Sequence, residues 1–433
     1  MKFTKMSLVA ALLIGSSAFA IENTKVSGDA SLFYGTGDDD SNSLFDKTDA
    51  AADAGLNLNV TTDLVKNSVV SISAGAGYTV LSTLGLENNL VSGVWGSAHG
   101  ATAGTGASYG SSLGGAKVEN ANWMNEAWIA ATAGKTTVKL GRMELDTPLV
   151  FTEKWSIEKN TFEAAVVINQ DIPDTTLVGA YVGNGNGTEN LGQDVTGTVY
   201  GLGLAAGAVV NQDGQFTTYG TDGAYAVGAI NNSFKPLTVQ AWYYDLTRLA
   251  TAYWLQADLD ASTLGVDGLS AGVQYSAQDV KTGDSLGINN TDTASVYAVK
   301  LGYEMKDLFT ASVAYSSVDD KGALTAANTA TQSGASKLYT EAWWNYGYIT
   351  QHDTNSYNVT VTSPVNGLFD LGLYYTNANN KATADNDLTE FTATAGKSFG
   401  PLDATLAYVN TKAKDQNNDS NYNIIQAYLT LNF

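Results

Sequence analysis

The stretch that decides the fold is LSAGVQYSAQ, residues 269–278, in which every second residue is apolar. Leu269, Ala271, Val273, Tyr275 and Ala277 alternate with Ser270, Gly272, Gln274, Ser276 and Gln278. Successive side chains of a β-strand point to opposite faces of the sheet. The alternation therefore predicts a strand with one apolar face and one polar face.

The same period of two recurs along the chain, for example in residues 56–60, 309–315 and 369–375. In a soluble sandwich the apolar face would point into a dry core, whereas in a membrane barrel it would point outward to lipid. The polar face consists of Gly, Ser, Thr, Asn and Gln in nearly every such stretch, which favours a barrel with a wet lumen.

Aromatic residues at the ends of the apolar faces also favour a barrel. Tyr rings are typical of membrane interfaces, where the ring is half buried and the hydroxyl stays wet. The residues in question are Tyr34, Tyr78, Tyr275, Tyr315, Tyr375 and Tyr408. The chain ends on a further alternating stretch, residues 425–433, closed by Phe433. This ending resembles the terminal strand by which the outer-membrane assembly machinery recognises its clients.

Composition excludes several classes of protein. The 433 residues include 44 Gly, 23 Tyr and no Cys, and only 15% are charged, against about 25% in a typical soluble domain. Without Cys there is neither a disulfide scaffold nor a Cys-ligated metal. The net charge of −21 disfavours nucleic acid as a partner and favours cations near the surface and in any cleft.

Residues 1–20 are predicted to be a cleaved signal peptide. Lys2 and Lys5 precede an apolar run at 6–15, and Ala18-Phe19-Ala20 fits a cleavage site. No later stretch reaches the roughly 18 apolar residues that a membrane-spanning helix needs. We therefore expect export to the outer membrane of a Gram-negative bacterium, with residues 21–433 forming one barrel domain of net charge −23.

Eight short turns join pairs of alternating stretches. They lie at 64–67, 134–135, 171–174, 233–236, 265–268, 304–307, 363–367 and 399–401. If both termini are periplasmic, eight inner turns separate nine hairpins, which predicts a closed antiparallel barrel of about eighteen strands; sixteen or twenty remain open, since 191–210 also alternates weakly. The long stretches 81–120, 183–223 and 319–336 are predicted to be external loops.

The third hairpin concentrates charge in a chain where charge is scarce. Its charged residues are Arg142, Glu144, Asp146, Glu153, Lys154, Glu158 and Lys159. Folded into a lumen, such a loop would form a charged constriction that selects solutes by size and charge. The alternative is a solvated external loop. Arg142 shares strand parity with Val138 and Leu140, so it would face lipid unless a bulge or the end of the strand intervenes.

The run LGRMELDTPL (140–149), followed by FTEKWSIEKNTFEAAVVINQDIPDTTLVGAYVG (151–183), resembles the major outer membrane protein porins of the Campylobacter and Arcobacter type. The specific match covers about 141–183, and the rest agrees only in layout. The resemblance implies an eighteen-stranded, cation-preferring, homotrimeric porin with its third loop in the lumen. It also implies that Ca²⁺ can bind near the constriction, where Asp146 is the candidate ligand; no cofactor is required.

Catalysis finds little support, because the two His residues, His99 and His352, are far apart and no G-x-S-x-G motif is present. The aromatic cluster Trp343-Trp344-Asn345-Tyr346 is interpreted as part of a girdle or a packed external loop, with stacking of a sugar or nucleobase as the alternative. The sequence predicts a non-enzymatic channel for passive diffusion of small hydrophilic solutes. The competing hypothesis is a barrel-anchored surface protein that binds partners through its external loops.

Overall fold

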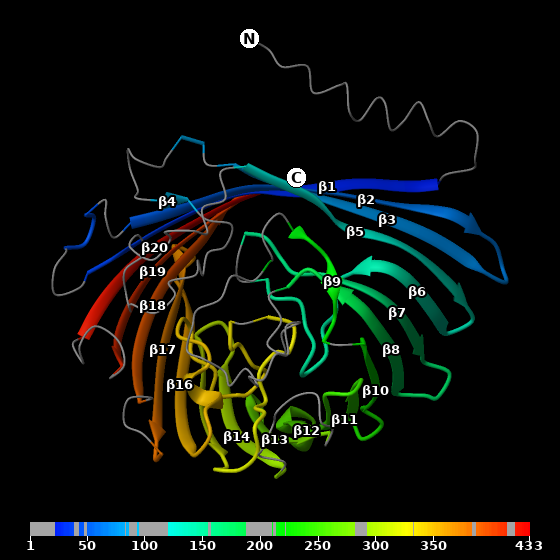
Figure 1. Cartoon of the computed structure of the whole chain (residues 1–433). Coiled ribbons are helices and arrows are strands. Elements are labelled where there is room, and N and C mark those ends of the chain that lie inside the picture. Colours follow the sequence, from blue (N-terminus) through cyan, green and yellow to red (C-terminus); the bar gives the residue numbers. More distant parts are fainter. Residues whose placement is uncertain are drawn as a thin grey trace.

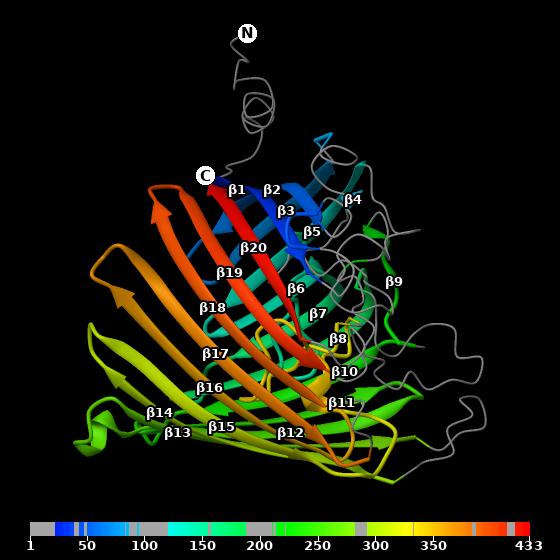
Figure 2. The same ribbon diagram turned by 90° about the vertical axis from the view of Figure 1, so that its left-hand side faces the viewer.

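The computed structural model is a closed antiparallel β-barrel of eighteen long strands, shown nearly end-on in Figure 1 and from the side in Figure 2. It describes residues 22–38, 43–46, 50–82, 84–85, 93–94, 120–154, 157–187, 210, 214–220, 222–281, 292–331, 333–382, 387–413 and 421–433. The predicted signal peptide, the weak hairpin at 191–209 and most of the predicted loops 81–120 and 183–223 lie outside these residues. Within them, no helix is long and apolar enough to cross a membrane.

The long strands follow one another around the wall in chain order. They are β1 (Glu22–Gly37), β2 (Ala50–Lys66), β3 (Ser71–Ser82), β5 (Asn120–Ala133), β6 (Thr136–Met143), β7 (Phe162–Asn169), β8 (Thr175–Gly185), β10 (Ala224–Asn231), β11 (Leu237–Leu246), β12 (Ala250–Asp260), β13 (Leu269–Val280), β14 (Ala294–Met305), β15 (Phe309–Val318), β16 (Thr354–Val365), β17 (Phe369–Asn380), β18 (Leu388–Phe399), β19 (Leu402–Ala413) and β20 (Asn421–Asn432). Four short elements are added: β4 (Gly93–Val94), β9 (Thr217–Thr218), η4 (Ala261–Leu264) and η5 (Tyr348–Thr350).

The barrel closes where β1 pairs with β20, in a register running from Asp29 opposite Asn432 to Gly37 opposite Ile424. The C-terminal residue extends this seam, because the Gly28 amide donates to the Phe433 carbonyl at 2.9 Å and the Phe433 amide returns a bond to Gly28 at 3.0 Å. Closure gives every strand two neighbours, which satisfies backbone donors and acceptors that lipid could not satisfy.

The two faces of the wall differ as the alternation predicts. On β13, Val273 and Tyr275 are 53% and 44% exposed on the outside, whereas Gln274 and Ser276 are 5% and 0% exposed on the inside. The apolar side chains thus point outward, and the polar face is directed into the lumen. Outward Tyr rings meet across neighbouring strands, and Tyr315 lies 6.0 Å from Tyr297 and 5.0 Å from Tyr357 between ring centroids.

Each of the eight predicted short turns overlaps or adjoins a turn in the structure, and the count of eighteen strands is confirmed. The turns predicted at 304–307 and 363–367 lie later, at 306–308 and 366–368, because β14 runs to Met305 and β16 to Val365. The first of the eight is also displaced, since β2 runs to Lys66 and the turn occupies 67–70 instead of 64–67. A bulge between Asp63 and Val65 adds a residue to one strand, which shifts the alternation on which the boundary was based.

The segment 319–336 contradicts its prediction as an external loop. It belongs to a longer connection, 319–353, between β15 and β16, whose yellow and gold trace in Figure 1 lies within the ring of strands. Ala327, Asn328, Ala330 and Thr331 are all at most 1% exposed. We call residues 319–353 the inserted loop. Its small side chains resemble those of a solvated loop in composition, but here they allow close packing inside the lumen.

Candidate functional site

The third loop, residues 144–161, connects β6 to β7 and projects into the lumen (Figure 1, teal). Its first part is a tight turn in which the Thr147 amide donates to the Val150 carbonyl at 3.1 Å and the Thr152 amide donates to Leu145 at 2.7 Å. Asn57 on β2 fixes the far part, because its side-chain amide donates to the Ile157 carbonyl at 3.2 Å. The loop is thus held against the wall at a point distant from its own strands.

The inserted loop packs against the third loop. The Thr329 amide donates to the Leu149 carbonyl at 2.9 Å, and the Asn328 side chain donates to the Phe151 carbonyl at 3.0 Å. Glu153 ties the two loops together, since its carboxylate accepts from Asn328 at 2.9 Å and also from the Thr331 and Ser333 hydroxyls. Two connections, not one, therefore narrow the lumen.

A second carboxylate fixes the inserted loop to the opposite wall. Glu390 on β18 accepts from the backbone amides of Trp343, Trp344 and Asn345 at 2.8, 3.0 and 2.8 Å. It also accepts from the Asn345 side chain at 2.6 Å. Four donors therefore converge on one side chain, and this clamp holds the segment that carries both Trp rings.

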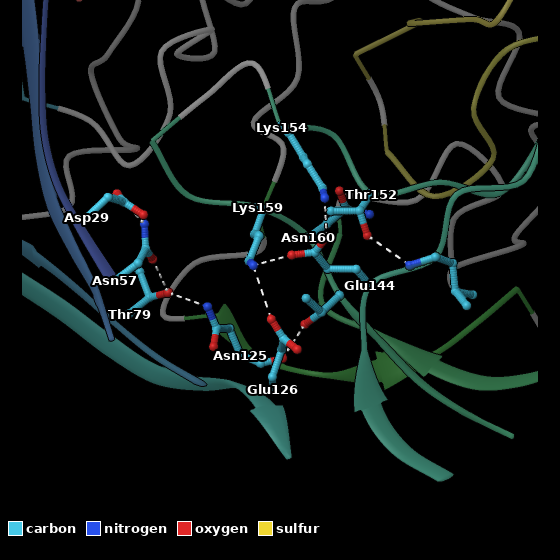
Figure 3. Close-up of polar contacts among 12 residues, drawn as sticks. Asp29, Asn57, Thr79, Asn125, Glu126, Glu144, Thr152, Lys154, Lys159 and Asn160 are labelled. Atoms are coloured by element: carbon cyan, nitrogen blue, oxygen red, sulfur yellow. Dashed lines mark hydrogen bonds and ion pairs between the residues drawn. The ribbon is translucent and has the colours of Figure 1, made fainter. Parts of the chain in front are cut away.

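Four charged groups form a cluster where the third loop meets β5 (Figure 3). Lys159 donates to Glu126 at 3.1 Å and to Glu144, and Lys154 pairs with Glu144 as well. Burial alone would raise the pKa of the Glu144 carboxyl, but hydrogen bonds from the two lysines hold that pKa below its ordinary value. Burial would lower the pKa of Lys159, yet its bonds to Glu144 and the Glu126 charge raise it. Two carboxylates therefore face two lysines at this point, and Lys139 on β6 adds a further positive charge close to Glu126 and Glu144.

The other predicted constriction residues lie elsewhere. Arg142 follows its strand parity onto the outer face, where it pairs with Glu163 on β7 at 2.9 Å and lies 4.1 Å from the Phe216 ring. No bulge turns it inward, so its assignment to the constriction is wrong. Glu153 and Glu158 are 1% and 0% exposed, which removes both carboxylates from the open part of the lumen.

Asp146 is open, with a side chain 82% exposed, and pairs with Lys337 of the inserted loop at 2.8 Å. A calcium site needs six to eight oxygen ligands, several of them usually carboxylates. In the described part of the chain, no group of three or more His, Asp or Glu side chains could hold a metal ion. The residues around Asp146 therefore do not fit Ca²⁺.

A cavity of about 640 Å³ lies inside the barrel between the two loops and the wall. Lys154, Ile157 and six residues of the inserted loop line one side, whereas β1, β16, β17, β19 and β20 supply the other. The wall residues are Ser31, Leu32, Asn358, Thr360, Tyr374, Thr405, Tyr428 and Thr430. Most are short and neutral, so the wall offers hydrogen bonds without strong charge.

Carboxylates follow the same inward rows of the wall towards the short turns. Asp29 precedes Ser31 by two residues on β1, Asp403 precedes Thr405 on β19, and Asp370 precedes Tyr374 by four on β17. Since side chains two apart share a face, all three point to the lumen side. Asn432 donates to Asp403 at 2.7 Å, and Asn57 donates to Asp29 at 3.1 Å. Within the described residues none of the three carboxylates has an ion-pair partner.

Sequence reasoning missed the inserted loop, its Glu390 clamp and these wall carboxylates. The wall carboxylates had a readable signal, because each lies on the polar parity of its strand close to a turn. Glu390 shares the inward parity of Leu388 and Thr392, where an isolated acid requires a partner. In the inserted loop the one signal that the sequence offers is the Trp343-Trp344 pair, and the interpretation as a girdle or a packed external loop does not predict its place inside the barrel.

Comparison with known proteins agrees with the fold and leaves the family open. No family model matches the chain, and no curated protein matches it. Among solved structures, OpdK of Pseudomonas aeruginosa with vanillate matches at 12% identity and TM-score 0.66, over 95% of this chain and 99% of that one. OccAB1 of Acinetobacter baumannii matches at 14% identity and TM-score 0.68, over 96% and 98%. P. aeruginosa OccK9 (OpdG) matches at 11% identity and TM-score 0.68, over 95% and 99%. These neighbours are outer-membrane porins of eighteen strands, and the chain shares their barrel fold.

Proposed function

We propose that this chain is an outer-membrane porin through which small hydrophilic solutes diffuse passively. The observation that carries the proposal is the closed barrel whose outer face is apolar and whose polar interior encloses a cavity of about 640 Å³. An apolar outer surface stabilises the barrel in a bilayer, while the polar wall keeps the interior wet. The porin fold of the structural neighbours supports this function and an outer-membrane location.

We further propose that the channel prefers cations, and that the wall determines this preference. In the third-loop cluster Glu126 and Glu144 are matched by Lys154 and Lys159, and Lys139 lies close by, so the cluster does not supply a negative field. Asp29, Asp370 and Asp403 lie on the wall beyond the cavity, where confined water and nearby protein weaken screening. The three carboxylates lie on one side of the wall, on β17, β19 and β1, and carboxylates that line a pore favour cations.

The likeness of 141–183 to Campylobacter and Arcobacter major outer membrane proteins supports a finer version of the proposal. The position of residues 144–154 and 157–161 inside the ring of strands supports the third-loop arrangement that the resemblance implies, and a homotrimer is part of the same proposal. Mass measurement of the detergent-solubilised, unheated protein tests the trimer. Calcium is left out of the proposal, because the surroundings of Asp146 do not fit the ion.

Planar-bilayer recording tests both parts. The purified protein should give stable conductance steps, and a plugged barrel that serves only as a surface anchor would give none. In a KCl gradient we expect a reversal potential of cation sign that shrinks towards about 1 M salt, where the Debye length is about 3 Å.

The variant Asp370→Asn with Asp403→Asn removes two wall charges and keeps their size. Its reversal potential should fall towards zero while assembly stays normal. Asp267→Asn, in the exposed turn between η4 and β13, is the matched control and should behave as wild type. Unchanged selectivity in the double variant would place the determinant elsewhere in the protein.

A further inference from the structure

The cavity wall carries an aromatic surface that the diffusion of ions does not require. Trp343 of the inserted loop is close to two other rings: Trp344, at 6.4 Å between ring centroids and 29° between planes, and Tyr374 of β17, at 6.3 Å and 39°. Tyr339 and Tyr428 also line the cavity. All of these rings except Trp344 are half buried, so each leaves part of its surface to the cavity.

The two tryptophans have different roles. Trp344 is 9% exposed and packs with Phe33, Val409 and Ile424 of the wall, which anchors this segment. The Glu390 clamp fixes the backbone amides of both residues. Trp343 is thus a ring held in place at the surface of a cavity, and a preorganised ring binds a ligand with little loss of side-chain entropy.

Groups that form hydrogen bonds surround these rings. Ser31, Thr360, Thr405 and Thr430 present hydroxyls, which both donate and accept. Among the described lining residues Lys154 is the one cation, and its charge is paired with Glu144. Glu341, the one lining carboxylate, is bound to the Ser336 amide and hydroxyl and to the Ala342 amide. The cavity therefore matches a ligand with a flat apolar face and a rim of hydroxyls, and it offers little to a charged one.

Resting on the proposed channel function, we infer that the cavity is a subsite for a neutral sugar, whose pyranose ring stacks on Trp343 and Tyr374 while its hydroxyls meet the threonine-rich wall. A pyranose ring presents a face of C–H groups to an aromatic surface and directs its hydroxyls sideways. The cavity volume of about 640 Å³ falls within the usual range of small-molecule sites.

Maltose is the probe, and block of the K⁺ current through reconstituted channels is the first readout. We expect concentration-dependent block in the wild type, weakened about fivefold in Trp343→Ala and largely restored in Trp343→Phe. Tyr357→Ala, a ring removed from the outer wall, is the matched control and should keep wild-type block. Heat-modifiable mobility confirms that each variant has folded.

Two comparison solutes separate this site from simpler explanations. Sorbitol has hydroxyls but no ring, so equal block by sorbitol would mean volume exclusion and would overturn the inference. Benzoate is an aromatic anion, and preferred binding of benzoate that is lost in Lys154→Gln would replace the sugar with an aromatic acid.

Fluorescence of the tryptophans in the detergent-folded barrel gives a readout independent of conductance. A saturable maltose titration in the wild type that disappears in Tyr374→Ala, which keeps Trp343 as the reporter, supports the site even if no current flows, in which case only the channel function fails. Ion conduction without any maltose response in either assay leaves the porin intact and refutes the subsite.

Discussion

Removing the Glu390 carboxylate should release the inserted loop from the wall. In Glu390→Ala, three backbone N–H groups and one side-chain amide lose their acceptor. Hydrogen bonds to charged groups contribute about 1.5–3 kcal/mol each, so four bonds set an upper bound of about 12 kcal/mol. Water in the cavity replaces some of the lost hydrogen bonds, and the variant also avoids the cost of burying a carboxylate, so the net loss is smaller than this bound. We expect a net loss of about 3 kcal/mol in loop anchoring, which is roughly a 100-fold rise in the open-loop population.

Limited proteolysis of intact cells measures this population. Wild-type protein should resist cleavage within 319–353, and Glu390→Ala should be cut there while the barrel stays assembled. Glu390→Gln should be intermediate, because its single carbonyl oxygen can serve the two Trp amides now bound by Oε1 but not the Asn345 groups bound by Oε2. Glu304→Ala is the control, since Glu304 is an inward-parity carboxylate near a short turn of β14. Equal protection of wild type and Glu390→Ala would refute the clamp.

Two further variants test separate parts of the structure. Burial raises the pKa of Glu341 to about 8, assisted by the charge of Glu153, so the contribution of Glu341 to loop stability is fully present below its ordinary pKa and is lost as pH rises through about 8. Open-channel current noise should therefore grow between pH 5 and 9 in the wild type and stay flat in Glu341→Gln. Parallel growth of the noise in both proteins would contradict this assignment. Phe433→Ser removes the exposed aromatic end of the seam beside Gly28 and should lower the heat-modifiable, assembled fraction in the outer membrane, whereas wild-type assembly levels would show that the terminal ring is dispensable.

The wall of the barrel was predictable because its determinants are local. Each strand is specified by its own alternation, and each short turn by residues that break it, so neither requires knowledge of a distant partner. The displaced first turn, at 67–70, shows the limit of this reasoning. A bulge at Asp63 and Val65 changes the parity without changing the composition, and only the pairing of β2 with β3 shows it.

For side chains of the strands, the sequence predicts which face of the wall they lie on, because strand parity determines it. For side chains of the loops inside the barrel, no such rule applies. Parity places Arg142 on the lipid side, and the structure puts it there beside Glu163. The hypothesis of a charged constriction relied instead on the concentration of charge in one loop. A high density of charged residues in one loop does not show which carboxylates pair with lysines and which are buried. Glu153, for example, is bound by Asn328 and Ser333, which are more than 170 residues away in the sequence. Contacts of this kind come from the packing of two loops, and no local pattern encodes them.

The location of selectivity follows from this division between wall and loops. Lysines of the third loop pair with glutamates in the structure. A paired lysine and glutamate leave mainly a short-range dipole. The wall carboxylates Asp29, Asp370 and Asp403 cannot be neutralised in that way by their own strands, because the alternation fills neighbouring inward positions with small neutral residues. These three acids therefore differ from Glu126 on β5, which Lys159 of the third loop reaches. In the mechanism that we propose, the wall gives the channel its charge preference, while the two loops set its width and the chemistry of its aromatic surface.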